Sequence, residues 1–183
     1  MAVSLDELMP RLQHQAKLGV ARTALVALGV GFEFLSRHSE EMQREIADWE
    51  EGRTLAIGVL PRGPRVTIRK GGRQLEMLGG DAYHADGAEL KVMFKNVDAA
   101  LLVLTGRIGA HTAFAEHRAL VHGEIAKAMQ ANRAMAIVVK YLFPGVMLRS
   151  ITRRMPVFSA SELLLKARLY AVIGPFLARG LFK

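Results

Sequence analysis

The sequence predicts an α+β fold, an antiparallel sheet of about five strands covered on one face by helices. The hydrophobic period supports this: it is helical over residues 4–50, alternates over 53–95 and is helical again after residue 97. Hydrophobic residues make up 51% of the 183 residues, enough for a sizeable core.

The N-terminal zone is expected to be helical throughout. Leu18, Ala21, Leu25 and Leu28 follow helical spacing. A second helix is predicted within the run 36–52, with Ser36 or Ser39 as its N-cap and Gly52 just past its end.

The middle zone is expected to form most of the sheet. In each segment the apolar side chains alternate along one face, and Pro or Gly marks the turns between segments. The predicted strands are residues 53–60, 65–70, 73–78 and 88–94.

Helical spacing returns after Asn96, a plausible N-cap, and Gly106 is placed to end the first of these helices. A short helix over 111–116, a strand over 118–123 and a long helix from Glu124 to Pro144 should follow.

The C-terminal zone is basic: residues 140–183 carry eight Lys and Arg against one acid, Glu162. Basic residues beside apolar ones are typical of a helix that lies on an anionic membrane surface. Packing on the domain or on a second copy is the alternative. The predicted membrane-contact residues are Arg149, Arg153, Arg154, Lys166, Arg168 and Phe176.

These zones predict three parts: an N-terminal helical extension (1–39), a central domain (40–143) and a basic amphipathic C-terminal extension (144–183). The acids Asp6 and Glu7 disfavour a secretory signal, so a cytoplasmic location is expected, peripheral to the membrane if the C-terminus docks. The apolar stretch from Leu18 to Leu35 contains Arg22 and Glu33, and we do not expect it to span a bilayer.

Motifs of catalysis are missing from the sequence. It has no cysteine, and no HExxH, GxSxG, Walker A or GxGxxG pattern. Gly106–Gly109 has the GxxG spacing of KH domains, but the strand that follows does not suit that fold. We therefore predict no enzyme, no catalytic residue, no metal ligand, no cofactor and no specific nucleic-acid partner.

Residues 88–133 resemble the sterol carrier protein type-two domain family. The pattern is an alternating strand, a helix of the form D-x-L-x-x-L-x-x-G-[KR]-[ILM], an Ala–Phe pair, and a short strand ending in Gly before a long helix. The matching residues are Asp98, Leu101, Leu104, Gly106, Arg107, Ile108, Ala113, Phe114 and Gly123.

The sequence departs from this pattern at three residues. His117 stands where the family usually has Gly, Ala119 replaces a larger inward residue, and Leu120 is apolar where polar residues are common. A smaller inward side chain could widen a cavity or be compensated by its neighbours.

The resemblance implies a non-enzymatic lipid-binding domain with a hydrophobic tunnel between the sheet and its helices. Family ligands include sterols, fatty acyl chains and other lipids, and a bacterial branch assists ubiquinone biosynthesis by holding prenylated intermediates. The alternatives are an interaction module with a filled core, as a homodimer or in a larger complex, and a nucleic-acid binder driven by charge. The expected tunnel lining is Ile57, Ile68, Leu90, Val92, Phe94, Leu101, Leu104, Phe114, Val121, Met129 and Met135.

Overall fold

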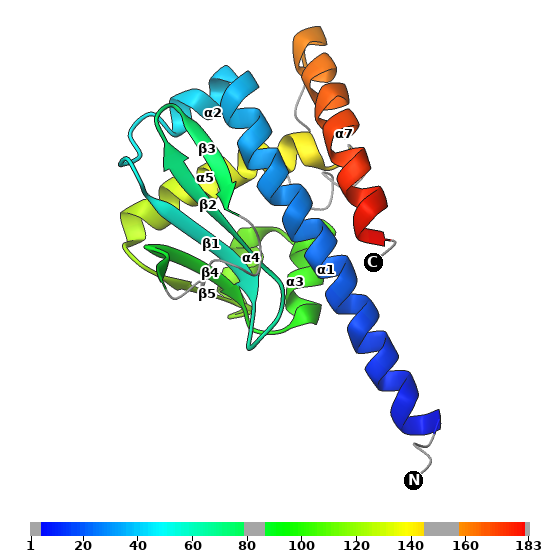
Figure 1. Ribbon diagram of the computed structural model, residues 1–183. Helices are drawn as coiled ribbons and strands as arrows, with labels where there is room; N and C mark the ends of the chain where they lie inside the picture. The colour runs from blue at the N-terminus through cyan, green and yellow to red at the C-terminus, as the bar shows by residue number, and fades with distance from the viewer. Residues whose placement is uncertain (1–4, 79–86, 145–157, 182–183) are drawn as a thin grey trace.

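The computed structural model describes residues 5–78, 87–144 and 158–181, with side chains over 9–78, 87–144 and 158–175. It confirms the α+β fold class: a five-stranded sheet with helices gathered on one side (Figure 1). The helices are α1 (Leu5–His38), α2 (Glu40–Glu45), α3 (Val97–Leu104), α4 (Ala110–Ala115), α5 (Ile125–Leu142) and α7 (Ala160–Leu181). The strands are β1 (Thr54–Val59), β2 (Arg65–Gly71), β3 (Gln74–Leu78), β4 (Leu90–Phe94) and β5 (Ala119–His122).

The sheet is mixed rather than wholly antiparallel, which corrects one part of the prediction. Its order is β3-β2-β1-β4-β5, and β4 runs parallel to β1 with Leu55 opposite Leu90 and Ile57 opposite Val92. Parallel neighbours need a crossover connection, and the β2–β3 hairpin lies within it. Alternation within a strand fixes which side chains share a face, not which edge the strand joins.

The second predicted helix is shorter than expected. Ser39 caps α2 as predicted, its hydroxyl accepting from the amide of Met42, but the helix ends at Glu45. The buried ammonium of Lys70 donates to the carbonyl of Ile46, which ends the helix from a distant strand. The chain then turns, so that Ile46 and Trp49 are both buried.

The core lies between the sheet and the helices. Leu55, Ile57 and Val59 of β1 face the helices, while Ala56 of the same strand is buried on the other face against Ala88. The central strand is therefore buried on both faces, which its small residues permit.

The long helix α1 has two distinct parts. Its second part, from Ala21 to Leu35, belongs to the same hydrophobic core as the sheet. Its first part projects beyond the rest of the fold, and α7 lies alongside its other end (Figure 1). The stretch of α1 from Ala21 to Leu35 thus shares the core of the sheet, although the sequence places it before the central domain.

Candidate functional site

The described structure has an open groove of about 1120 Å³. It lies over the outward side of α5, between α2, the α3–α4 connection and the start of α7. Its lining residues are Glu41, Arg44, Glu45, Val103, Ile108, Gly109, Ala110, His111, Asn132, Arg133, Met135, Ala136, Ile137, Val139, Lys140, Phe143 and Glu162.

The floor of the groove is largely apolar. Helical spacing puts Ala136, Val139 and Phe143 on one side of α5, while Ala134, Val138 and Tyr141 turn into the core. Val103 and Ile108 add apolar surface from the opposite wall. An apolar floor of this kind can bury a hydrocarbon chain or an apolar ring.

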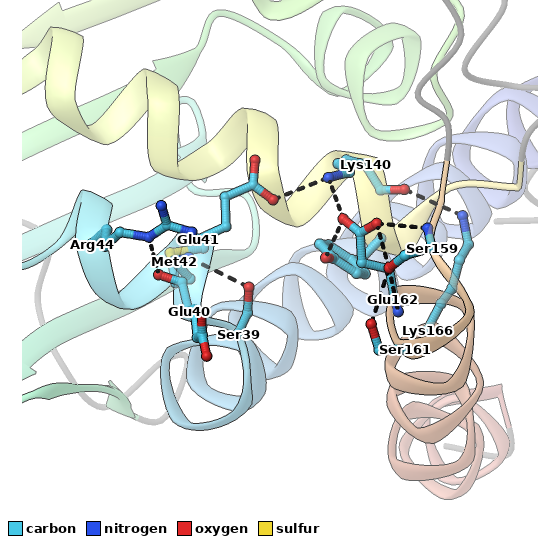
Figure 2. A network of polar contacts seen from close by, with 11 residues as sticks. Ser39, Glu40, Glu41, Met42, Arg44, Lys140, Ser159, Ser161, Glu162 and Lys166 are labelled. Atoms are coloured by element: carbon cyan, nitrogen blue, oxygen red, sulfur yellow. Dashed lines mark hydrogen bonds and ion pairs between the residues drawn. The ribbon is translucent and has the colours of Figure 1, made fainter.

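The rim is charged, and its carboxylates are already paired. Lys140 binds Glu41 at 3.0 Å and Glu162 at 2.9 Å, while Arg133 binds Glu45 at 2.9 Å. Figure 2 shows Lys140 between the two carboxylates, one from α2 and one from α7. The ion pairs of the rim thus join α2, α5 and α7. Each of the carboxylates of Glu41, Glu45 and Glu162 has a cation as its partner.

Arg44 is placed differently from these rim cations. It lines the groove, and its Nε donates to the carbonyl of Glu40 at 3.3 Å (Figure 2). The described contacts show no carboxylate bound to Arg44. A guanidinium with donors to spare is a good anchor for a carboxylate or phosphate.

Glu162 is held by a capping box at the start of α7. Its carboxylate accepts from the amide of Ser159 at 2.8 Å, and the Ser159 hydroxyl accepts from the amide of Glu162 at 3.3 Å. The hydrogen bond from Lys140, followed by those from Ser159, lowers the pKa of Glu162 to about 2. The group is therefore charged at any pH near neutrality.

Burial alone would lower the pKa of Lys140, but hydrogen bonds to Glu162 and Glu41 raise it above the usual value. Lys140 and Lys166 also lie over the ring of Phe158, with Nζ atoms 5.7 and 4.7 Å from its centre. Lys140 is thus a fixed cation that ties α5 to α2 and α7 at the rim.

Side chains from α7 complete the C-terminal end of α5. The last carbonyls of a helix have no partner within it. Lys166 donates to the carbonyls of Lys140 and Phe143 at 3.2 and 2.6 Å, and Tyr170 donates to that of Leu142 at 3.0 Å. Burial lowers the pKa of Lys166. Its ammonium is thus directed at the C-terminal end of α5.

The space between sheet and helices, where the tunnel is predicted, is nearly filled. It holds a void of only about 20 Å³. Four predicted tunnel residues line this void: Ile57, Phe94, Leu104 and Met135. Met135, Val103, Val139 and Phe143 line both the void and the outer groove, so one layer of side chains separates them.

The other predicted tunnel residues lie away from both spaces. Ile68, Leu90 and Val92 are buried in the core, with Leu101 and Phe114 half-buried against it. Val121 is on the edge strand β5 and Met129 on the first half of α5, and the two are 39% and 55% exposed.

Of the predicted membrane-contact residues, the structure describes Lys166, whose bonds are given above, and Arg168, which is exposed. Arg149, Arg153, Arg154 and the side chain of Phe176 lie outside the described residues.

Sequence reasoning missed the polar rim. Its residues come from three helices far apart in the chain, and no local pattern joins Glu41 to Lys140. One signal was present: Ser159-Ala160-Ser161-Glu162 has the spacing of a capping box, and Glu162 is the one acid of the basic zone.

Within the described residues, no three His, Cys, Asp or Glu side chains are grouped to hold a metal ion. One described helix, Met9–His38 within α1, is long and apolar enough to cross a membrane, and half of its most apolar window is buried in the fold. The core helix of a soluble protein meets the same criterion.

The chain matches no family model and no curated protein by sequence. Its structure is similar to that of sterol carrier protein 2, with a TM-score of 0.45 and 18% identity, over 62% of this chain and 91% of that one. It is also similar to UbiJ-SCP2, a ubiquinone synthesis protein, with a TM-score of 0.40 and 16% identity, over 57% and 81% of the two chains. Both TM-scores are below 0.5 and both identities are below 20%.

Proposed function

We propose that this protein binds a hydrophobic or amphiphilic small molecule and carries or presents it, without chemistry of its own. The observation that carries the proposal is the groove of about 1120 Å³, with its apolar floor along α5 and its charged rim. An apolar chain would lie over Ala136, Val139 and Phe143. A polar head would meet the rim, where Arg44 has donors to spare.

The chemistry of the rim supports binding rather than catalysis. A general acid or base works best with a pKa near the operating pH. Glu162 has a pKa of about 2 and accepts from Lys140 and Ser159, which suits a structural carboxylate. Glu41 and Glu45 are likewise held in ion pairs.

The ligand classes we propose are those that the sequence resemblance implies: a fatty acyl chain or other lipid, a sterol-like ring system, or a prenylated quinone precursor. All of them combine a large apolar body with a small polar end, which is what the lining of the groove accommodates. We further propose that the protein works in the cytoplasm, at or near a membrane surface.

An interaction module is the second candidate, for example an accessory factor that assembles a ubiquinone-biosynthesis complex. The nearly filled core favours it, because a void of about 20 Å³ leaves no room for a lipid between sheet and helices. In this case the groove would receive a segment of a partner protein.

Native mass spectrometry of the full chain, with extraction and identification of bound lipid, tests the proposal. The matched pair of variants is Ala136→Trp and Ala126→Trp. Both residues are exposed on α5, but only Ala136 lines the groove. We expect wild type and A126W to carry the same lipid and A136W to lose it. A chain free of lipid after incubation with mixed lipids would favour the interaction module.

A further inference from the structure

The two edge strands of the sheet, β3 and β5, are protected to different degrees. At the β3 edge, the amide of Leu75 donates to the hydroxyl of Ser36 at 3.0 Å. The amide of Met77 donates to the carboxylate of Glu33 at 3.4 Å. Both acceptors belong to α1, which packs along β3 and closes that edge to a further strand.

The β5 edge has no such cover in the part of the chain that the structure describes. Next to β4, the amide of Lys95 donates to the carbonyl of Arg118 at 2.9 Å, just before β5 begins. Backbone groups alternate between the two sides of a strand, so those of Ala119 and Val121 face away from β4. No described contact gives the N–H or C=O of Val121 a partner. The strand also lacks the Lys or Pro that often keeps other strands from an edge.

Apolar side chains lie exposed beside this edge. Val121 is opposite Val92 in the β4–β5 register, so it points to the helix side of the sheet, where the core lies. On the same side, Ile125 begins α5 and is 81% exposed, and the exposed Met129 follows one turn later. A strand added to this edge would therefore gain backbone hydrogen bonds and cover apolar surface at the same time.

The direction of the backbone groups limits how a second copy of β5 can pair here. In an antiparallel pair, the residues that face outward on one strand must lie opposite the outward residues of the other. A two-fold pair is therefore centred on a residue, and not between two residues. The centres that keep most of β5 paired are residues 120, 121 and 122.

Charge selects the centre at Val121 among these three. This centre places Arg118 of each copy opposite Glu124 of the other, which gives two ion pairs. A centre at Leu120 would instead place Glu116 opposite Glu124, and like charges directly opposite each other are destabilising. The third centre would place Glu124 opposite Leu120.

Both charged groups have capacity for such a pair. The described contact of the Arg118 guanidinium with Glu116 uses its Nε and leaves the other donors. Glu124 is 3.9 Å from Lys127, which is bound more closely by two other carboxylates. The ion pairs between copies therefore form without breaking one within a copy.

We propose that this protein is a two-fold homodimer in which β5 pairs antiparallel with β5 of a second copy about Val121. The N–H of each Val121 donates to the carbonyl of the other, and the two five-stranded sheets become one. Val121 and Ile125 of both copies pack together on the helix side, while Arg118 and Glu124 form the flanking ion pairs. None of these residues lines the groove, so the dimer does not depend on the groove's ligand.

Sedimentation velocity of the full chain over a series of concentrations tests this proposal. The matched variants are Val121→Pro and Val121→Thr, which replace the same exposed side chain, but only the first removes the outward N–H. An edge strand tolerates Pro where the N–H faces solvent, so V121P should fold. We expect V121T to remain dimeric. V121P should weaken the dimer on the order of tenfold or more, because each dimer loses two hydrogen bonds.

Exchanging the flanking charges tests the register. Arg118→Glu and Glu124→Arg each place like charges opposite one another, and we expect each to weaken the dimer on the order of tenfold. The double variant R118E/E124R again has opposite charges across the interface and should recover most of the affinity. A136W serves as an independent control and should dimerise as wild type does, whether or not the groove holds lipid.

Three outcomes would overturn the proposal. The first is a wild type that stays monomeric at the highest concentration of the series. The second is a dimer that V121P leaves unchanged when circular dichroism shows the variant folded. The third is a double variant R118E/E124R that dimerises no better than either single variant, and this result decides the question even if V121P does not fold.

Discussion

The two parts of α1 share one helix and similar apolar composition, yet they have opposite surroundings. Leu25, Phe32 and Leu35 are almost completely buried, whereas Met9 and Leu12 are more than half exposed. The difference comes from what lies beside each part. The second part is enclosed by the sheet, α5 and α7 (Figure 1), and the first part extends past them. The apolar content of a helix therefore does not decide its burial without the partners supplied by the rest of the chain.

Small residues make the enclosure of the second part tight. A Cβ on Gly31 would lie 2.8 Å from Cγ1 of Val138 on α5, and one on Gly29 would overlap Val66 and Met77 of the sheet. Gly19, in the projecting part, has open space around it. Glycine thus serves close packing in one part and has no such role in the other.

The largest contrast between the two parts should come from removing apolar side chains. Phe32→Ala leaves a cavity in the core, and we expect the free energy of unfolding to fall by about 3–5 kcal/mol. Leu12→Ala should change it by less than about 0.5 kcal/mol, because Leu12 is on the surface. Urea denaturation followed by circular dichroism measures both. Similar losses for the two variants would mean that the projecting part is covered in solution.

Adding one methyl group to a glycine should change stability in opposite directions in the two parts of α1. Gly29→Ala forces Val66 and Met77 to move, and we expect a loss of about 1–3 kcal/mol. Gly19→Ala meets nothing, and it should stabilise the helix by about 0.5–1 kcal/mol. Thermal melts of G29A and G19A show directly whether each variant is stabilised or destabilised. A stabilised G29A would contradict the close approach of Gly29 to Val66 and Met77.

Weakening the attachment of α7 to α5 should expose the second part of α1, as the first part already is. Lys166→Met leaves the carbonyls of Lys140 and Phe143 without their donor, which we expect to cost about 1–3 kcal/mol. Hydrogen exchange should accelerate at the end of α5 and in the covered stretch of α1. Arg168→Met is the control, since Arg168 is exposed, and equal exchange in both variants would argue against the capping role.

The smallest expected effect is a pH dependence of stability that comes from Glu162, which attaches α7 to Lys140 of α5. The folded pKa of Glu162 is about 2, below its ordinary value of 4.5, so its contribution is present above pH 4.5 and lost as the pH falls toward 2. Glu162→Gln should remove this dependence and lower stability by about 1 kcal/mol at neutral pH. Unfolding midpoints from neutral pH down to about pH 2 compare the two proteins. An identical acid response in E162Q would assign the effect to other carboxylates.

Local patterns in the sequence predicted the helices and strands themselves better than they predicted which elements pair or pack together. Alternation identified the inward residues Leu55, Ile57 and Val59, and the capping role of Ser39 was recognisable from its residue type. The parallel pairing of β1 with β4 and the early end of α2 were not predictable, since both depend on distant contacts, such as Lys70 with Ile46.

The candidate site illustrates the same limit. Most of the apolar residues predicted for a tunnel are buried in the core, and four of them line a void of about 20 Å³ there. Periodicity reports which side of a strand is inward and not how much space lies on that side. The groove lies over the outward side of α5, where residues such as Ala136 and Lys140 give no apolar signal in the sequence.

The packing of α7 against α1 also bears on how the chain is made. Residues 39–159 separate the two helices, so the apolar side of α1 must wait for almost the whole intervening chain to be synthesised before its cover exists. During translation, Ala27, Val30 and the helix around them would be open to other partners. Nascent chains of this protein should therefore be good clients for chaperones that recognise apolar helices, and they should lose that property once α7 has emerged from the ribosome.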